Sequence, residues 1–346
     1  MREMLRSVEE VLNGTRVILR MDLDLPIDNG EILDRSRLEK SLDTIELLIK
    51  KDCRILIIGH RGRPEGRETS LSLKIVYLEL MEMLNMGGRR EIESVFIDDI
   101  TKTDEIDVAL GKNRIVFAEN LRFWKGEEEN NSNFLNGARS VCQFFVNDAF
   151  AVAHRKHASI MLFKLMPAFY GLSFIAEVKM IEKSLERRSG KRVVVLGGAK
   201  KDKMKYWEEI EEKVDWILLG GKLPSQLEES EREKMAASGK VIVAKLREDG
   251  LDIDDKSIER FKEILKEAGT IIWAGSMGYF EGEDSKKGSE EIAKEIAMNK
   301  GYKIIAGGDT GAVIENLGLK ERIDYVCSGG GVMLEYLAKG KLVSWE

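Results

Sequence analysis

RVILRMD, at residues 16–22, is a short apolar run that ends in a charged residue, and the chain repeats this pattern between longer charged segments. In the first half the other runs are 54–59, 114–118 and 144–147. In the second half they are 191–196, 216–219, 240–244, 270–274, 303–306 and 325–327. Because helix-like segments separate these runs, the alternation predicts an α/β fold with parallel sheets.

The chain is long enough for two hydrophobic cores, with 346 residues of which 43% are hydrophobic. Between the two series of strands, Pro167 and Gly171 interrupt the chain before a segment of good helix formers at 176–187. We therefore predict one domain at 1–165, a second at 189–346, and the boundary in the region 166–188.

Composition excludes several classes of protein. The 61 acidic and 55 basic side chains give a net charge of −6, so no global positive field is available to hold a nucleic acid. Cys53, Cys142 and Cys327 are odd in number and far apart, which favours structural thiols over disulfides or a zinc site. No run of about 18 apolar residues occurs, and we expect a soluble, cytoplasmic protein with no membrane partner.

Glycines of the second half gather just after the predicted strands. They are Gly197 and Gly198, Gly220 and Gly221, Gly275 and Gly278, Gly307 and Gly308, and Gly329 to Gly331. One such pair is explained as well by a turn or a helix cap, but the repetition favours a nucleotide crevice at the carboxyl ends of the strands. A dehydrogenase is disfavoured because no GxGxxG follows the first strand of either half.

The first half carries basic side chains at the corresponding positions. All three histidines lie there, two of them closely flanked by arginines in HRGR (60–63) and HRKH (154–157), and Arg37 and Arg122 also follow apolar segments. Arginine forks bind phosphate and carboxylate in a bidentate manner, so the set favours a small polyanionic substrate. Surface salt bridging would explain any one of these arginines on its own.

Several ordered motifs carry a family resemblance. In the first half they are RMDLDLP (20–26), GHRGRP (59–64), ENLRF (119–123), VNDAF (146–150) and AHRKHAS (153–159). In the second half they are LGGAK (196–200), WAGSMGYFE (273–281), IAGGDT (305–310) and SGGG (328–331). Over nearly the whole chain this sequence resembles the phosphoglycerate kinase family.

The resemblance implies two Rossmann-like domains joined by a hinge helix. It implies 3-phosphoglycerate on the N-terminal domain, ATP or ADP with Mg2+ on the C-terminal one, and reversible phosphoryl transfer between 1,3-bisphosphoglycerate with ADP and 3-phosphoglycerate with ATP. Catalysis would come mostly from in-line positioning and cationic stabilisation, with domain closure excluding water.

The resemblance also implies roles for individual residues. The implied phosphoglycerate-binding residues are Asp22, Asp24, Arg37, His60, Arg63, Arg122, His154 and Arg155. The implied nucleotide-binding residues are Gly197, Gly198, Lys200, Gly221, Glu281, Gly307, Gly308, Asp309 and Thr310. Arg37, Lys200 and Lys203 are the implied catalytic residues, and Asp309 is the implied magnesium ligand.

Some positions depart from the family pattern. Asp24 stands where the family has Asn, and a carboxylate there repels an anion unless a cation or a proton compensates. The segment after Lys200 is shorter than in the family, which leaves open which lysine faces the phosphates. Ala274 and Ser276 replace Asn and Pro, removing a polar side chain near the nucleotide. Acids at 254–255 replace Gly-Pro on the adenosine side.

Three interpretations remain open from these residues. The leading one is a compact ATP-dependent phosphoglycerate kinase. The second is a paralogous kinase for another phosphorylated or carboxylic acid, motivated by Asp24. The third is a catalytically weak homologue that binds nucleotide or phosphoglycerate, motivated by Ala274 and the shortened lysine segment. The chain shows no exposed apolar stripe, and we expect a monomer.

Overall fold

The structure, a computed structural model, describes residues 5–86, 91–186 and 189–345. Its internal contacts divide the chain into two units, Met1–Ala176 with Val343–Glu346, and Glu177–Leu342. The division falls inside helix α5 (Leu172–Leu185), which begins before the helix predicted from Ala176 onward. Arg187, the predicted last residue of that helix, lies outside the described residues.

The first unit is built on a six-stranded sheet with the order β5-β6-β4-β1-β7-β8. Its strands are β1 (Arg16–Arg20), β4 (Arg54–Ile58), β5 (Ser94–Ile97), β6 (Ile115–Ala118), β7 (Phe144–Asn147) and β8 (Ala168–Tyr170), and every pairing is parallel. The connections leave β1 in one direction and reach β7 in the other. The switch point, where such sheets bind ligands, therefore lies between β1 and β7.

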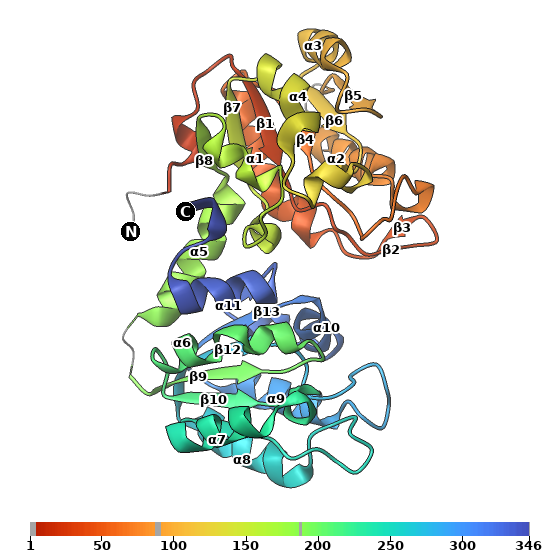
Figure 1. The fold of residues 1–346 in the computed structure, drawn as a ribbon. Coiled ribbons are helices and arrows are strands. Elements are labelled where there is room, and N and C mark those ends of the chain that lie inside the picture. Colours follow the sequence, from red (N-terminus) through yellow and green to blue (C-terminus); the bar gives the residue numbers. More distant parts are fainter. Residues whose placement is uncertain (1–4, 87–90, 187–188, 346) are drawn as a thin grey trace. The chain divides into compact units, whose positions relative to one another are not determined.

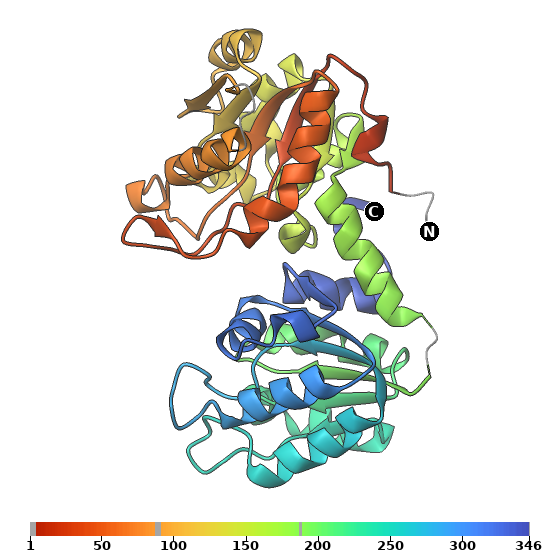
Figure 2. The same cartoon turned by 180° about the vertical axis from the view of Figure 1, so that it is seen from behind.

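Helices cover both faces of this sheet because its strands are apolar on both sides. Along β1, Val17 and Leu19 pack with α1 (Ser36–Lys50) and α2 (Lys74–Asn85), whereas Ile18 packs with α3 (Thr103–Lys112) and α4 (Asn136–Val141). Figure 1 shows the face covered by α3 and α4, and Figure 2 shows α1 and α2 on the opposite one.

A small hairpin extends from the carboxyl end of β1. Its strands are β2 (Ile27–Asp28) and β3 (Glu31–Ile32), which pair antiparallel. The turn residues Asn29 and Gly30 both have positive φ values, 46° and 83°. This is the two-residue Asn-Gly connection whose twist matches a β-hairpin.

The second unit is built on another six-stranded parallel sheet, with the order β11-β10-β9-β12-β13-β14. Its strands are β9 (Lys191–Leu196), β10 (Trp216–Leu219), β11 (Val241–Val243), β12 (Ala268–Ala274), β13 (Tyr302–Ala306) and β14 (Tyr325–Cys327). Numbered along the chain, this is the 3-2-1-4-5-6 order of a Rossmann sheet. The switch point lies between β9 and β12.

Trp273 of β12 lies at the centre of the second core and is fully buried. It packs with α8 (Asp255–Lys266), α9 (Lys287–Met298) and α10 (Gly308–Asn316), which cover one face of the sheet (Figure 2). Helices α6 (Trp207–Glu211) and α11 (Gly330–Lys339) lie over the other face (Figure 1), and α7 (Glu229–Ser238) contacts the edge strand β11.

Short 3-10 helices complete the connections. In the first unit they are η2 (Val8–Glu10), η3 (Thr69–Leu71), η4 (Leu121–Phe123), η5 (Lys125–Glu127), η6 (Ser132–Leu135), η7 (Phe150–Val152), η8 (Ile160–Lys164) and η12 (Val343–Trp345). In the second unit they are η9 (Lys201–Tyr206), η10 (Leu223–Gln226) and η11 (Lys320–Arg322).

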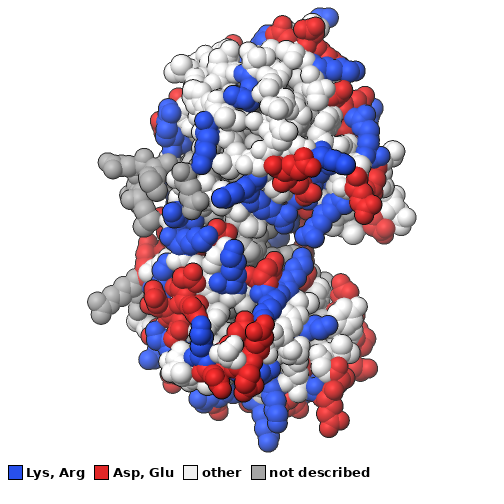
Figure 3. Space-filling model, in the orientation of Figure 1, with Lys and Arg blue, Asp and Glu red and all other residues white. Residues whose placement is uncertain are grey.

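The predicted α/β class with two parallel sheets is confirmed. The sequence missed β5 and β8, two short strands at the edges of the first sheet. Cys53, Cys142 and Cys327 are buried free thiols. None of the described helices is long and apolar enough to cross a membrane. On the face drawn in Figure 3, acidic and basic side chains are interspersed over the second unit.

Candidate functional site

The loop that follows β1 is tied to the first turn of α1. The Arg37 guanidinium donates through Nη1 to Asp22 Oδ1 at 2.9 Å and to the carbonyl oxygen of Asp24 at 2.9 Å. Burial raises the pKa of the Asp22 carboxyl, and the Arg37 charge opposes that rise. Three residues predicted to bind substrate are therefore joined at the carboxyl end of β1.

Asp24 has a structural partner of its own in the loop after β4. Its Oδ1 accepts a hydrogen bond from the Gly62 backbone N–H at 2.8 Å, and its Oδ2 lies 4.0 Å from His60 Nε2. Gly62 has a φ of +64°, and a Cβ there would lie 2.7 Å from a Leu71 methyl carbon, so the loop requires glycine. The carboxylate that departs from the family pattern thus orders this loop.

Behind these loops, the side chains of Arg20, Arg122 and Arg155 converge with His60 and His157, and we call this set the cationic group. Burial lowers the pKa of His60 well below its usual value, and the charges of Arg20, Arg122 and Arg155 and the nearby His157 lower it further. Burial, followed by the charges of Arg20, Arg122 and Arg155 and the nearby His154, lowers the pKa of His157 to about 3. Both imidazoles are therefore neutral at physiological pH, and the arginines carry the positive charge.

Some donors of this group are buried without a protein partner. Among the described residues, Arg20 Nη1 and Arg122 Nη2 have no hydrogen-bond acceptor, and neither has the His60 ring nitrogen Nδ1 a partner. Buried polar groups are nearly always paired, so unpaired guanidinium nitrogens inside a cationic cluster call for an anionic ligand. Arg122 is held in place through Nη1, which donates to the Gly62 carbonyl, and through Nε, which lies 3.2 Å from Glu128 Oε1.

The remaining predicted residues of the first unit lie in the segments that follow β4 and β7. Arg155 and His154 are half-buried and follow η7, which comes just after β7, while Arg63 is exposed in the loop after β4. The sequence interpretation missed Arg20 itself, although RMDLDLP contains it, and it missed Glu127 and Ser159. The available signal was an arginine at the carboxyl end of an apolar strand, two residues before Asp22.

In the second unit, the loops after β9, β10 and β12 are packed backbone to backbone. The Gly197 N–H donates to the Ala274 carbonyl at 3.0 Å, and the Gly198 N–H donates to the Ser276 carbonyl at 2.7 Å. A Cβ on Gly197 would lie 2.3 Å from the Ser276 oxygen, and one on Gly221 would lie 2.4 Å from the Gly198 nitrogen. These glycines are required for the close approach of the loops at the switch point.

Lys203 is the lysine that reaches this edge of the sheet. Its Nζ donates to the Gly197 carbonyl at 3.1 Å. Burial lowers the pKa of Lys203, and the Asp309 carboxylate raises it. Lys200 is exposed, and Lys201 points elsewhere, with Nζ 3.0 Å from Glu231 Oε2.

The amino end of α10 offers open backbone beside Asp309. Gly307 has a φ of +98°, and a Cβ on Gly307 or Gly308 would meet nothing within 4 Å. Asp309 is exposed in the first turn of the helix. Thr310, predicted to face the phosphates, is fully buried, and its Oγ1 accepts from the Gly275 N–H at 2.7 Å, tying the loop after β12 to α10.

Glu281 lies in the loop after β12, and the acids at 254–255 lie at the start of α8. Glu281 is exposed, and its hydrogen bond with the Tyr279 hydroxyl raises the pKa of that phenol. Asp254 caps α8, since its Oδ1 accepts from the Ser257 N–H at 2.8 Å. The acids that replace Gly-Pro thus begin a helix.

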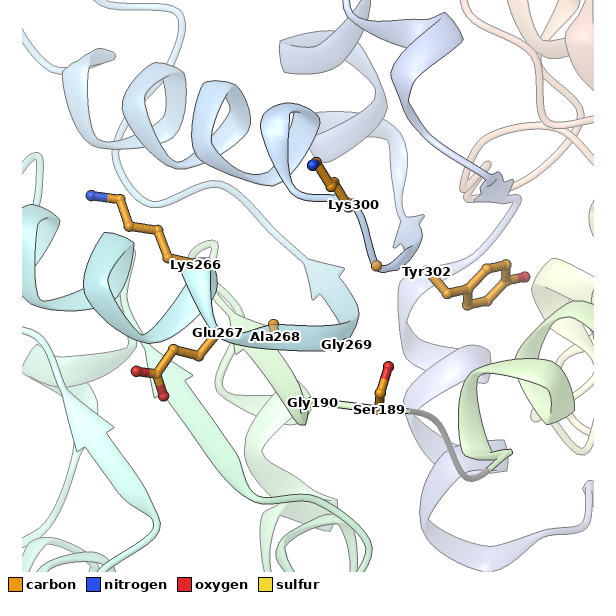
Figure 4. A pocket seen from close by; sticks show the side chains of 9 residues that line it. Ser189, Gly190, Lys266, Glu267, Ala268, Gly269, Lys300 and Tyr302 are labelled. Atoms are coloured by element: carbon orange, nitrogen blue, oxygen red, sulfur yellow. The ribbon is translucent and has the colours of Figure 1, made fainter.

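A separate hollow of about 380 Å3 lies at the other end of this sheet, where β9, β12 and β13 begin (Figure 4). Gly190, Gly269 and Gly301 line it together with Lys266 and Lys300. The labelled side chains extend in different directions in Figure 4, so its charged groups do not converge on one point.

A family model supplies the decisive comparison. The model described as phosphoglycerate kinase matches residues 7–238 and 224–341 of this chain. The chain belongs to the phosphoglycerate kinase family. Members of this family transfer a phosphoryl group from ATP to a carboxyl group, and this chain is a phosphotransferase of that class.

Individual members of the family are similar to this chain in sequence. The phosphoglycerate kinase of Leptospira biflexa serovar Patoc is 34% identical, over 95% of this chain and 94% of that protein. The phosphoglycerate kinase of Dictyoglomus turgidum is 32% identical, over 95% of this chain and 94% of that protein.

Solved structures of the family are similar to this chain in fold. The phosphoglycerate kinase structure from Coxiella burnetii has a TM-score of 0.77 at 29% identity, covering 99% of this chain and 97% of that one. The structure from Pyrococcus horikoshii OT3 has a TM-score of 0.78 at 25% identity, with the same coverage of both chains. The resemblance inferred from the motifs is confirmed over nearly the whole length.

Proposed function

We propose that this phosphoglycerate kinase family member binds 3-phosphoglycerate at the cationic group of the first unit and ATP at the switch point of the second. The reaction is the reversible transfer of a phosphoryl group between 1,3-bisphosphoglycerate with ADP and 3-phosphoglycerate with ATP. The observation that carries the proposal is the pair of buried guanidinium nitrogens, Arg20 Nη1 and Arg122 Nη2, at the switch point of the first sheet, which find no acceptor within the described part of the chain.

The cationic group suits an acid that carries both a phosphate and a carboxylate. Arg122, Arg155 and Arg63 provide guanidinium groups for the anionic oxygens, neutral His60 provides a hydrogen bond without adding charge, and His154 supports its neighbour Arg155. Arg37 stands apart from this group, because Asp22 and the Asp24 carbonyl already hold it at the end of β1. It is the arginine best fixed to meet the reacting carboxylate.

The second unit suits a nucleotide polyphosphate. The open backbone at Gly307 and Gly308, at the start of α10, offers N–H groups and the positive end of the helix dipole to phosphate oxygens. Lys203 is held at the neighbouring loop, with Lys200 exposed before it. Gly197, Gly198 and Gly221 line the sheet edge, and exposed Glu281 is the proposed partner of the ribose.

Mg2+ fits the donors at this edge of the sheet. Asp309 is a single exposed carboxylate next to open backbone, and among the described residues no three His, Cys, Asp or Glu side chains cluster into a metal site. That arrangement agrees with the usual binding of Mg2+ through one or two carboxylates together with substrate phosphates. When bound, the ion would neutralise charge on the phosphates, and Asp309 would hold it.

Phosphoryl transfer requires the chain's own side chains to position the substrates and to stabilise the developing negative charge. In phosphoryl transfer, negative charge spreads over the equatorial oxygens of the transferred group, so fixed cations and N–H groups stabilise the transition state. Lys203 is suited to this task because burial has already removed much of its hydration and its amine is anchored on Gly197. We further propose that the protein works as a cytoplasmic monomer.

A coupled assay with 3-phosphoglycerate and Mg-ATP tests the function. Arg37→Ala tests the substrate end, with Arg35→Ala as its control, because Arg35 precedes the same helix and is exposed. Asp309→Ala tests the metal end, with exposed Glu315→Ala on the same helix as its control. We expect turnover by the wild type and both controls and a loss of turnover in Arg37→Ala and Asp309→Ala.

The opposite pattern would contradict the proposal. If the wild type failed to turn over these substrates while it bound nucleotide saturably, the substrate assignment would be wrong. If Arg37→Ala retained wild-type kinetics, the proposed substrate site would be wrong even though the reaction stood.

A further inference from the structure

Glu127 is a fully buried carboxylate beneath the cationic group, and it is not one of the residues proposed to contact a substrate. It lies at the end of η5, in the chain segment that follows ENLRF. Its Oε2 accepts from the Ser159 N–H at 2.9 Å, and its Oε1 accepts from the Ser159 hydroxyl at 2.6 Å. The Glu127 backbone carbonyl also accepts from the Ala158 N–H at 2.9 Å.

The same carboxylate is the counter-ion of Arg20. Arg20 Nη2 lies 3.4 Å from Glu127 Oε1, and Arg20 Nε donates to the Ser159 hydroxyl at 2.6 Å. Both members of this ion pair are fully buried. The three side chains close a ring of hydrogen bonds that fixes two of the guanidinium nitrogens and leaves the third, Nη1, without a protein partner among the described residues.

The ring also connects to the histidine segment of the site. His157 Nδ1 lies 3.8 Å from Glu127 Oε1, and His157 immediately precedes the residues that Glu127 holds. Glu127 thus fixes Arg20 from β1 and the 157–159 segment after β7 at the same time. These two segments flank the switch point of the first sheet.

We propose that Glu127 is a positioning residue for the anionic substrate: its buried carboxylate, with the Ser159 hydroxyl, holds the Arg20 guanidinium in the one orientation that leaves Nη1 for an oxygen of the substrate. Glu127 does not touch the substrate in this arrangement and acts through Arg20. The inference rests on the proposed function only for the identity of the anion, 3-phosphoglycerate.

Electrostatics explains why the site needs such a residue. The positive charge of Arg155 acts on Arg20, and the charge of Arg20 acts in turn on Arg122. Asp22 is the second carboxylate, after Glu127, whose charge acts on Arg20. A buried guanidinium with no counter-ion is strongly unfavourable, so it would rotate or draw in water before substrate arrives. A carboxylate fixed on the protein side of Arg20 prevents that, and the substrate meets a donor that is already oriented.

Glu127→Gln tests the proposal because it keeps the shape and removes the charge. We expect the KM for 3-phosphoglycerate and its dissociation constant, measured by calorimetry without nucleotide, to rise roughly tenfold or more. The KM for Mg-ATP should stay within about twofold of wild type. Glu129→Gln is the matched control, because that neighbouring side chain is exposed, and it should behave as wild type.

Two further variants separate positioning from folding. Ser159→Ala leaves both charges in place and removes only the shared hydroxyl, so it should raise the KM for 3-phosphoglycerate by a smaller factor. In an Arg20→Lys background, Glu127→Gln should add less than about twofold to the KM, since residues that act as a unit are not additive.

The outcomes either support the proposal or overturn it. A fall in kcat with both KM values unchanged would show a merely structural role, and full additivity with Arg20→Lys would show that Glu127 does not act through Arg20. Wild-type 3-phosphoglycerate binding by both Glu127→Gln and Ser159→Ala would also overturn it. If the wild type did not use 3-phosphoglycerate at all, the proposed function would fail separately, and titration with inorganic phosphate would still compare the variants.

Discussion

The carboxyl group of Asp148 should make the stability of the first unit depend on pH. Asp148 follows β7 and is buried, and its Oδ1 accepts from the Phe174 N–H at 3.0 Å, at the beginning of α5. The hydroxyl groups of Ser41 and Thr44 on α1 and the Ser173 N–H also hydrogen-bond to it. Burial raises the pKa of Asp148 from 3.8 to about 7, because these hydrogen bonds offset only part of the lost hydration.

The sign and size of the effect follow from the two pKa values. Between about pH 4 and pH 7 the folded unit keeps a proton that the unfolded chain releases, so the free energy of unfolding falls as pH rises. The stabilising contribution is fully present below pH 3.8 and is lost as pH passes through about 7. A difference of about 3 between the pKa values corresponds to roughly 4 kcal/mol over the whole window, or about 1.4 kcal/mol per pH unit.

Asp148→Asn removes this titration while keeping the shape of the protonated acid. We expect the free energy of unfolding of the variant, relative to wild type, to increase by about 2 kcal/mol between pH 5 and pH 7. Urea titrations at pH 5, 6, 7 and 8, read by hydrogen exchange on peptides from β1 and β4, would report the first unit alone. Asp43→Asn is the matched control, since Asp43 is exposed on α1, one residue before Thr44.

A difference in unfolding free energy that does not change with pH would refute this reasoning. If Asp148→Asn and wild type kept the same difference in unfolding free energy, within about 0.5 kcal/mol, from pH 5 to pH 8, Asp148 would not be protonated in the folded unit in that range. If Asp43→Asn gave the same slope as Asp148→Asn, the effect would come from general surface charge rather than from burial.

Three shorter predictions concern the second unit. Lys203→Met should lower kcat by about 100-fold or more in the coupled assay by removing a fixed cation, whereas Lys201→Met should leave it unchanged. Gly221→Ala should destabilise this unit by about 1–3 kcal/mol in urea, because φ is +61° and the Cβ would lie 2.4 Å from the Gly198 nitrogen; wild-type stability would contradict the loop packing. Trp273→Ala should cost about 3–5 kcal/mol by leaving a cavity in the fully buried core, and hydrogen exchange should show the loss in β12 but not in β1.

The strands of the two cores could be predicted because each is a continuous apolar run. The runs at 191–196, 216–219 and 325–327 match β9, β10 and β14, since strands buried on both faces need no alternation with polar residues. β5 and β8 were missed for the opposite reason. β5 is a partly exposed edge strand, SVFI, and β8 is a three-residue strand that directly follows Pro167 and falls inside the predicted domain boundary.

The site could be predicted in residue type but not in arrangement. Arginines and histidines at strand ends indicated an anion site, yet the sequence could not show that Arg20 meets Glu127 and Ser159, which are 107 and 139 positions away. It also could not choose among the lysines after Lys200, because the choice depends on η9, which carries Lys203 back to Gly197. Contacts of this kind depend on the tertiary fold rather than on local pattern.

The glycines of the second half have two different physical causes. Gly197 and Gly221 are needed because loops meet there, and a Cβ on either residue would lie less than 2.5 Å from the opposing backbone. Gly307 and Gly308 have open space in front of them, so loop packing requires glycine at neither position, although the φ of +98° favours glycine at Gly307. At Gly308, close approach of an outside group is the remaining reason to omit a side chain. The glycine clustering therefore supports the proposed phosphate contacts most directly at the start of α10, whereas the glycines after β9 and β10 mainly allow the neighbouring loops to pack together.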